Sequence, residues 1–148
     1  MRNSMRILGI DYGEARVGIA ITDGLNITAQ GLETIQRNGS DKVILRRLDE
    51  ILNQYEVDTI VVGMPLNMNG TISERAKVTE LFIHKLKCKY NKLKIETVDE
   101  RLTTVEAHKT MNFLDINKNK KKNIVDTISA VYILETYLNK LKNSLKND

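Results

Sequence analysis

The sequence lacks most of the residues that mark a secreted, disulfide-stabilised or membrane-spanning protein. Its 148 residues include one cysteine, one proline and no tryptophan. The lone Cys88 cannot form a disulfide within the chain, and no cluster of Cys and His has the spacing of a zinc site. The longest apolar run, residues 60–66, is much shorter than the roughly 20 residues that cross a bilayer. No secretory signal precedes the first expected strand, so we expect a cytoplasmic protein with no membrane partner.

The residues that are present fit one globular domain. Apolar residues make up 41% and charged residues 28% of the chain, which is ordinary for a folded domain. A chain of this length buries about two-thirds of its unfolded surface, so it folds without disulfides or other cross-links. No linker or internal repeat divides the sequence. We therefore expect a single domain over residues 1–148, in which residues 142–148 form a frayed polar tail.

Charge is distributed unevenly along the chain, although the net charge is only +4. Residues 1–84 carry 9 basic and 11 acidic side chains, whereas residues 85–148 carry 14 basic and 8 acidic ones. The basic excess comes from two groups of lysines: Lys85, Lys87, Lys89, Lys92 and Lys94, then Lys118, Lys120, Lys121 and Lys122. Such groups attract a polyanion such as nucleic acid, but they are also typical of a solvated surface.

Five segments have the alternating or β-branched pattern of strands. They span residues 5–10, 17–23, 28–35, 59–63 and 93–98. A tight turn at Asp11, Tyr12 and Gly13 separates the first two, and the glycine there would allow a positive φ. Short connections among the first three predict an antiparallel meander. The fourth segment is almost entirely apolar, which predicts a strand buried on both faces.

Two helices are predicted between these strands. Ser40 fits the N-cap of a helix whose apolar face ends at Tyr55. Thr71 begins a capping-box pattern for a second helix, which extends to about residue 90. The residues expected on the buried face of this second helix are Val78, Leu81, Phe82 and Leu86.

The last third of the chain is predicted to be mainly helical. We expect a helix over residues 103–113, a lysine-rich loop over residues 115–122 and a last helix capped by Asn123. The element order is therefore β-β-β-α-β-α-β-α-α. Three antiparallel strands followed by strand–helix units predict an α/β fold, with a mixed five-stranded sheet and helices on both of its faces.

Motifs of the common enzyme classes are absent. There is no P-loop, no Rossmann glycine motif, no nucleophile elbow and no H-E-x-x-H. Three acids lie at expected element ends: Asp11 after the first strand, Glu100 after the fifth, and Asp126 in the first turn of the last helix. They converge if the first and fifth strands end at the same sheet edge. Crowded carboxylates repel unless a cation lies between them, and all-oxygen ligands favour Mg²⁺ or Mn²⁺.

Each acid also has a structural interpretation that the sequence leaves open. Asp11 could form an Asx turn, Glu100 could pair with Arg101, and Asp126 could complement a helix N-terminus. In a metal site, two ions about 3.5–4 Å apart would hold the attacking and leaving oxygens of a phosphodiester. Arg101 and the lysines of residues 118–122 would then contact the flanking phosphates.

Four blocks of the sequence resemble the YqgF-type, RuvX-like proteins of the RNase H-like superfamily. They are residues 10–13 with 16–20 and Asp23; residues 62–67 with Gly70 and Thr71; residues 99–104 with Glu106 and Ala107; and Lys122 with Val125, Asp126, Ala130, Ile133 and Leu134. The blocks occur in the family's order and span nearly the whole chain. The most specific of them is the segment Asp-Glu-Arg-Leu-Thr-Thr over residues 99–104.

The resemblance implies an RNase H-like fold and a metal-dependent nuclease that acts on structured nucleic acid. The family is described both as Holliday-junction resolvases and as nucleases that mature the 5′ end of the 16S ribosomal RNA precursor. It implies Asp11, Glu100 and Asp126 as the metal-binding, catalytic acids. The residues implied beside them are Arg16, Arg101 and Thr103. Many RNase H-like enzymes carry a ligand on the fourth strand, whereas residues 63–65 are Gly-Met-Pro here, so the second carboxylate is expected from Glu100.

Other functions remain open at this point. An RNA- or ribosome-associated binding factor with structural acids fits the uneven charge, and the aromatic content of 5% argues against a stacking platform for single strands. A nucleotide-binding domain of the actin/Hsp70 type shares the turn at residues 11–13, but such proteins need two duplicated halves. Symmetric cutting of a four-way junction would require a homodimer. The sequence does not decide between RNA and DNA.

Overall fold

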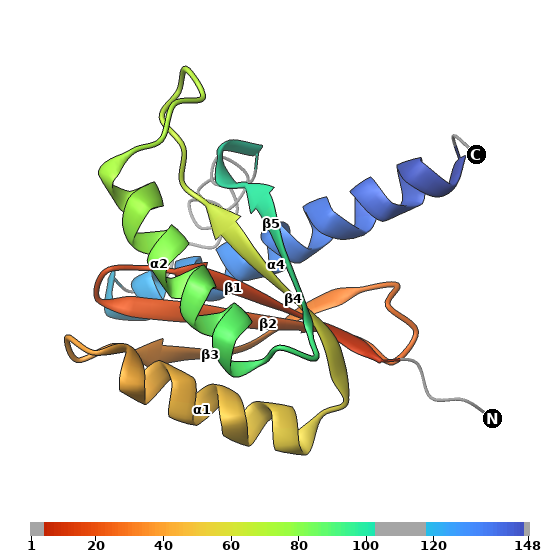
Figure 1. Cartoon of the computed structure of the whole chain (residues 1–148), viewed down its shortest axis with the longest axis horizontal. Helices are drawn as coiled ribbons and strands as arrows, with labels where there is room; N and C mark the ends of the chain where they lie inside the picture. The colour runs from red at the N-terminus through yellow and green to blue at the C-terminus, as the bar shows by residue number, and fades with distance from the viewer. Residues whose placement is uncertain (1–4, 103–117, 147–148) are drawn as a thin grey trace.

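The computed structural model describes residues 5–102 and 118–146, with the backbone alone for residues 102, 118–126 and 146 (Figure 1). Residues 1–4, 103–117 and 147–148 lie outside the description, and so does the helix expected over residues 103–113. The described elements are β1 (Arg6–Tyr12), β2 (Arg16–Thr22), β3 (Ala29–Gln36), α1 (Asp41–Gln54), β4 (Val57–Met64), α2 (Glu74–Lys89), β5 (Lys94–Asp99), a 3₁₀ turn η1 (Glu100–Leu102) and α4 (Lys118–Lys146).

The five strands form one mixed sheet in the order β3-β2-β1-β4-β5. The pairs β1–β2 and β2–β3 are antiparallel, which confirms the predicted meander. The pairs β1–β4 and β4–β5 are parallel, with Ile10 opposite Val62 and Met64 opposite Asp99. Strands β1, β4 and β5 therefore end at the same edge of the sheet, which is the condition for the acids after β1 and β5 to meet.

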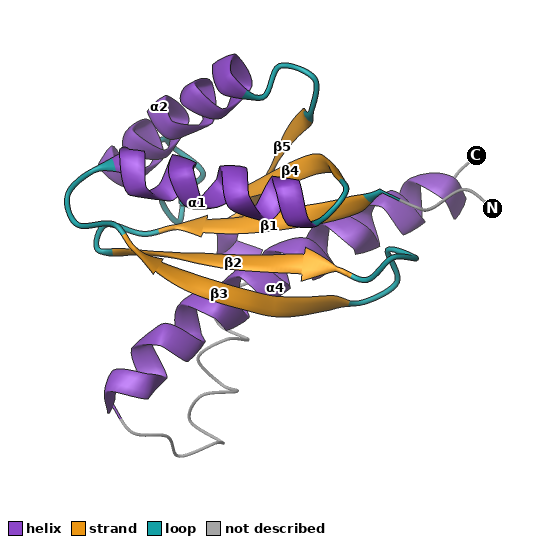
Figure 2. Ribbon diagram, turned by 90° about the horizontal axis from the view of Figure 1, so that it is seen from below, coloured by secondary structure: helices purple, strands orange, loops and turns teal. Residues whose placement is uncertain are grey.

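Helices cover both faces of the sheet (Figure 2). Helices α1 and α2 lie on one face, and α4 crosses the other. The strand residues alternate between these two layers. In β1, Leu8 and Ile10 belong to the core with α1 and α2, whereas Ile7 packs in the cluster of α4. In β4, Val62 and Val61 divide in the same way, so β4 is buried on both faces as predicted.

Helix α4 approaches the sheet closely because glycines lie beneath it. A β-carbon on Gly9 would come within 2.5 Å of Leu134 Cγ, and one on Gly31 would come within 2.1 Å of Thr127 Cγ2. Real β-carbons do not approach other atoms so closely. The absence of side chains at these positions therefore fixes how near the helix lies to the sheet. Thr127 also exchanges a hydrogen bond of 2.9 Å with Thr34 of β3.

The first helix begins as predicted, and the second differs in its cap and its buried face. Ser40 caps α1 and its side chain accepts from the amide of Lys42. Helix α2 is capped by Ser73, whose hydroxyl accepts from Ala76 N, rather than by Thr71. The buried residues of α2 are Ala76, Thr79, Phe82, Ile83 and Leu86. Phe82 and Leu86 are as predicted, but Val78 and Leu81 are exposed, because the buried stripe runs at helical spacing from Ala76 through Thr79 and these two positions lie outside it.

Helix α4 is longer at both ends than predicted. It begins at Lys118, so the lysines expected in a loop before Asn123 are helical. Lysine is a good helix former, and no proline or glycine interrupts this segment. The helix also extends to Lys146, past the expected start of fraying at residue 142. No described helix carries an apolar stretch long enough to cross a membrane.

The hairpin between β1 and β2 is tighter than predicted. Asp11 and Tyr12 are still part of β1, and the turn begins at Gly13, whose amide donates to the carbonyl of Arg16 at 2.9 Å. Gly13 does not have a positive φ. A β-carbon on Gly13 would lie 2.3 Å from the carbonyl oxygen of Arg16. Glycine is therefore required there for close approach of the backbone rather than for a left-handed conformation.

Candidate active site

Asp11 and Glu100 meet at the sheet edge where the parallel strands end. Strand β4 lies between the two strands that carry them. Asp11 belongs to the same face of β1 as Ile7 and Gly9, which is the face that α4 covers. Glu100 opens η1 directly after β5. Its Cγ lies 3.1 Å from the position of a β-carbon on Gly63, so its side chain lies over β4 on this same face.

The two carboxyl groups are in direct contact, and this contact changes the pKa of Asp11. Burial raises this pKa well above its usual value, and the hydrogen bond with Glu100 and the negative charge of Glu100 raise it further. The positive charge of Arg75 acts in the opposite direction. The guanidinium of Arg101, the partner that the sequence offered for Glu100, binds the carboxylate of Asp99. The predicted convergence of Asp11 and Glu100 is therefore present in the fold.

The third predicted acid, Asp126, has its side chain outside the described part of the structure. Its backbone lies in α4, eight residues after the helix begins at Lys118. It is therefore more than two turns from the N-terminus and not in the first turn as predicted, so it cannot serve to complement the end of the helix. It precedes Ala130 by four residues, which places it on the same helix face. The carbonyl of Ala130 lies against Gly9, two residues before Asp11.

The donor set at this edge suits a hard divalent cation. Two carboxylates in contact supply oxygen ligands of the kind that Mg²⁺ and Mn²⁺ prefer. Their mutual repulsion is relieved when a cation lies between them. Among the side chains that the structure describes, no group of three acids, histidines or cysteines is close enough to hold a metal.

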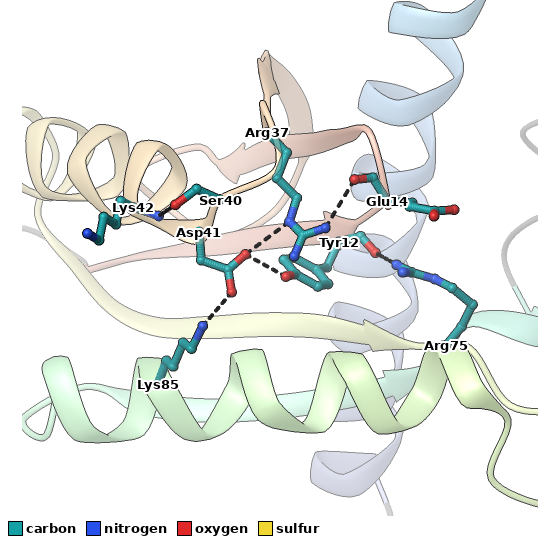
Figure 3. A network of polar contacts seen from close by, with 8 residues as sticks. All are labelled: Tyr12, Glu14, Arg37, Ser40, Asp41, Lys42, Arg75 and Lys85. Carbon is teal, nitrogen blue, oxygen red and sulfur yellow. Dashed lines mark hydrogen bonds and ion pairs between the residues drawn. The ribbon is translucent and has the colours of Figure 1, made fainter.

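A network of polar contacts supports the end of β1 on the opposite face (Figure 3). The hydroxyl of Tyr12 donates to Asp41 at 2.5 Å, and Asp41 also accepts from Arg37 at 3.1 Å and from Lys85 at 2.8 Å. The ring of Tyr12 stacks on Phe82, with ring centroids 4.1 Å apart. These contacts join β1, α1 and α2 immediately beside Asp11. They fix the strand that carries the first acid.

Arg75 links this network to the acids. Its Nη2 donates to the carbonyl of Tyr12 at 2.6 Å, and its guanidinium lies 5.8 Å from the centre of the Tyr12 ring. It is also the cation whose charge lowers the pKa of Asp11. Sequence reasoning missed this residue. A signal was present, because an arginine in the first turn of a helix is unfavourable beside the helix dipole and needs another partner.

Arg101 holds a loop beside the site. Its Nε contacts both carboxylate oxygens of Asp99, at 3.0 and 2.9 Å. Its Nη1 donates to the carbonyl of Met68 at 3.0 Å, and the Asn67 carbonyl lies 3.4 Å away. The guanidinium therefore joins β5 to the segment between β4 and α2. The hydrogen bonds and charge of Arg101 lower the pKa of Asp99, and they outweigh burial, which acts in the opposite direction.

The structure describes only part of the remaining residues that were predicted to contact nucleic acid. Arg16 begins β2, opposite Gln36 of β3, and its carbonyl closes the hairpin turn. Thr103 and the side chains of Lys118, Lys120, Lys121 and Lys122 lie outside the described residues. The backbone of these four lysines forms the start of α4. Their roles in binding nucleic acid stay predictions.

Comparison with known sequences gives the relatives of this chain. A model of the RuvX family, described as Holliday junction resolvase, matches residues 5–140. A protein of Ruminiclostridium cellulolyticum, named as a candidate pre-16S rRNA nuclease, is 52% identical over 143 residues, which cover 97% of this chain and 100% of the relative. A protein of the same name from Acetivibrio thermocellus is 49% identical, over 90% of this chain and 95% of that one.

Solved structures show that the fold is shared more widely. The Holliday junction resolvase of fowlpox virus matches with a TM-score of 0.58 at 14% identity, over 93% of this chain and 99% of that one. RuvC of T. thermophilus, in complex with a Holliday junction substrate, matches with a TM-score of 0.56 at 10% identity, over 93% and 96% of the two chains. These likenesses confirm the RNase H-like α/β fold. The family match over residues 5–140 and the identity to both curated relatives show that the chain belongs to the RuvX family.

Proposed function

We propose that this protein is a nuclease that hydrolyses phosphodiester bonds of structured nucleic acid with divalent metal ions held by Asp11, Glu100 and Asp126. The observation that carries the proposal is the contact between the carboxyl groups of Asp11 and Glu100 at the sheet edge. A fold gains no stability from pushing two acids together. Such pairs are typical of sites that take up a proton or a cation during function.

The third ligand of the proposal is Asp126. Its position one helical turn before Ala130, on the face of α4 that lies against β1, supports this assignment. The glycines beneath α4 keep the helix close enough to the sheet for a short aspartate to contribute. We propose two bound ions, Mg²⁺ or Mn²⁺, because a phosphodiester needs both its attacking and its leaving oxygen stabilised.

In this proposal, different residues bind the metal ions, position the strand that carries Asp11 and contact the substrate. A bound divalent ion supplies a water of lowered pKa and stabilises the charge of the leaving oxygen. Asp11 and Glu100 hold the ions at the sheet edge, and Arg75 fixes the backbone that carries Asp11 through the Tyr12 carbonyl. We propose that Arg16, Thr103 and the four lysines of residues 118–122 contact flanking phosphates. We propose that Arg101 attracts the substrate phosphates by its charge and also holds the loop between β4 and α2 in place.

We propose the 5′ end of the 16S ribosomal RNA precursor as the substrate. Two relatives that cover nearly the whole chain carry names that refer to this RNA. The reaction would take place in the cytoplasm. A second candidate is a Holliday junction, because the family model and two structures of the same fold have resolvase names. Resolution of a symmetric junction would require a homodimer.

Cleavage assays with both substrates test the proposal. The wild-type protein, Asp11→Asn and Glu100→Gln are incubated with precursor RNA or a four-way DNA junction, with Mg²⁺, Mn²⁺ or EDTA. We expect metal-dependent cleavage by the wild type and a loss of at least about a hundredfold in both variants, since each removes a metal ligand. Glu80→Gln, on the exposed surface of α2, is the matched control and should cleave normally.

The outcomes separate the candidate functions. Cleavage of RNA by a monomer supports precursor processing, whereas symmetric cutting of the junction by a dimer supports resolution. Equal cleavage by Asp11→Asn and the wild type would refute the assignment of the site. If divalent ions cause neither cleavage nor a rise in melting temperature, the protein is a binding factor with structural acids.

A further inference from the structure

The loop between β4 and α2 presents an apolar side chain beside the proposed site. Residues 65–73 contain no charged residue. Met68 is 90% exposed, and Ile72 of the same loop is 53% exposed. The loop and η1 extend from the same edge of the sheet (Figure 1). Single exposed apolar side chains are common on protein surfaces, so the position of Met68 in this loop, and not its exposure alone, is what the following contacts address.

The loop is held in one conformation by its own hydrogen bonds. The amide of Gly70 donates to the Asn67 carbonyl at 2.8 Å, which closes a turn with Met68 at its tip. Gly70 has a φ of +86°, a conformation that favours glycine. The amide of Asn67 donates to the Thr71 carbonyl, and the amide and hydroxyl of Thr71 both donate to the side chain of Asn69. Met68 is therefore presented by an ordered turn.

Arg101 ties this turn to the strand that leads into Glu100. Its guanidinium binds Asp99 on one side and the carbonyl of Met68 on the other. Glu100 lies between Asp99 and Arg101 in the sequence. The tip of the loop is therefore linked through one arginine side chain to the end of β5, where Glu100 follows.

The chemistry of the loop indicates what Met68 contacts. Phosphates are bound by cations and free amide or hydroxyl donors. Residues 65–73 have no cation, and the side-chain amide of Asn67 donates within the loop, to Thr71. The remaining apolar part of a nucleic acid is the face of a base, which side chains reach only where the base is unstacked. An ordered loop also loses little conformational entropy on binding.

We propose that Met68 packs against the face of an unstacked base of the nucleic-acid substrate, next to the bond that is cut. The inference rests on the proposed nuclease function and deepens it, because it makes an unpaired base part of what the site recognises. Arg101 is then a positioning residue for this contact. Apolar wedges of this kind also hold a duplex open at the step where they insert.

Binding to matched RNA and DNA probes tests the proposal. Affinity is measured by fluorescence anisotropy in the Asp11→Asn background, so that no probe is cut. One probe is a perfect duplex, and the other has the same length and one bulged base, which is 2-aminopurine. Met68→Ala should weaken binding of the bulged probe about fivefold, at the lower end for a single base contact. Duplex affinity and the salt dependence of binding should not change, because no phosphate contact is lost.

Matched variants distinguish the base contact from general effects. Met68→Phe should keep or increase affinity for the bulged probe, because an aromatic ring stacks better on a base. Leu25→Ala is the control, since Leu25 is 71% exposed in the turn between β2 and β3, at the opposite end of the sheet. Arg101→Lys should weaken bulge binding in the same way as Met68→Ala. Met68→Ala, Met68→Phe and Leu25→Ala should melt within about 1 °C of their parent, because an exposed side chain contributes little to stability.

Three results would overturn the proposal: unchanged affinity in Met68→Ala, an equal loss for duplex and bulge, or an equal loss in Leu25→Ala. Unchanged affinity would leave a protein partner as the ligand of the loop. The ratio of RNA to DNA affinity shows which nucleic acid supplies the base. Failure of the nuclease function is visible separately, as an absence of cleavage by a wild-type protein that still shows the bulge-dependent contact.

Discussion

Glu100 lies directly over Gly63, with its Cγ 3.1 Å from the position that a β-carbon on Gly63 would take. The same position lies 2.5 Å from Cδ1 of Ile133 in α4. Strand β4 therefore contributes space to the site rather than a side chain. An acid at position 63 would collide with Glu100 and Ile133, so this position of β4 and Glu100 cannot both supply a carboxylate.

The first prediction follows from this contact. Gly63→Ala should displace the side chains of Glu100 and Ile133, with a loss of about 1–3 kcal/mol in the free energy of unfolding. Metal-dependent cleavage should fall further than stability alone explains, since Glu100 is moved from Asp11. Gly24→Ala is the control, because no atom lies within 4 Å of its added carbon. Normal cleavage by a stably folded Gly63→Ala would contradict the placement of Glu100.

The second prediction is that Asp11 is needed for metal binding but lowers the free energy of unfolding of the metal-free protein. Asp11→Asn removes one of two acids that are in contact. We therefore expect the metal-free variant to be more stable than the wild type by about 0.5–2 kcal/mol, as is common when a functional site is disabled. Thermal melts with and without Mn²⁺ measure this. Manganese should raise the melting temperature of the wild type and not of the variant, and a lower metal-free melting temperature in the variant would refute the prediction.

The third prediction concerns pH and Asp41. Burial alone would raise the pKa of Asp41, but hydrogen bonds from Lys85, Tyr12 and Arg37 outweigh it and lower this pKa below the ordinary 3.8. The ionised form is thus favoured in the folded state. Its contribution to stability is complete above about pH 4 and is lost as pH falls through the lower, folded pKa. Asp41→Asn should cost about 1–3 kcal/mol at pH 7, and this difference should shrink below pH 4.

Asp49 offers a matched comparison for this measurement. It also accepts from a tyrosine, Tyr90 at 2.7 Å, and pairs with a lysine, Lys89 at 3.1 Å. Its side chain is 47% exposed, whereas that of Asp41 is 9% exposed. Asp49→Asn should therefore cost less than about 1 kcal/mol. Equal costs for the two variants, measured by denaturant titration from pH 3 to 7, would show that burial does not strengthen the Asp41 network.

The fourth prediction concerns Arg75. Lysine at this position keeps the charge but not the planar group that reaches the Tyr12 carbonyl at 2.6 Å. Arg75→Lys should lower kcat by about tenfold or more, because small displacements of reacting groups reduce catalysis strongly. The melting temperature and KM should change little. Arg46→Lys, on the exposed side of α1, is the control. A change in KM alone would assign Arg75 to substrate binding instead.

Much of the fold could be predicted because its signals are local. The alternating residues of β1 and β2 and the apolar run of β4 identify buried strands without knowledge of their neighbours. The boundaries depend on tertiary contacts that the sequence does not display. Thr71 matches a capping box, but Asn69 already binds its amide, so the cap passes to Ser73. Polarity predicts a loop over residues 115–122, but lysine favours helix, and the part from Lys118 onward is helical.

The candidate site was predictable in part for the same reason. The positions of Asp11 and Glu100 after two strands required only that the strands be parallel. Arg75 escaped prediction because its role depends on a carbonyl of another element, that of Tyr12. The role of Gly63 could not be predicted either, because the side chains of Glu100 and Ile133 that occupy the space above it come from other elements.

The packing of α4 on β1 and β4 also has a consequence for synthesis on the ribosome. Among the described elements, α4 alone covers the sheet face on which Asp11 and Glu100 lie, and it is the last of them to be translated. A nascent chain therefore exposes Ile7 and Val61 until α4 emerges and docks. On the proposed assignment, Asp126 joins Asp11 and Glu100 only when α4 docks on the sheet.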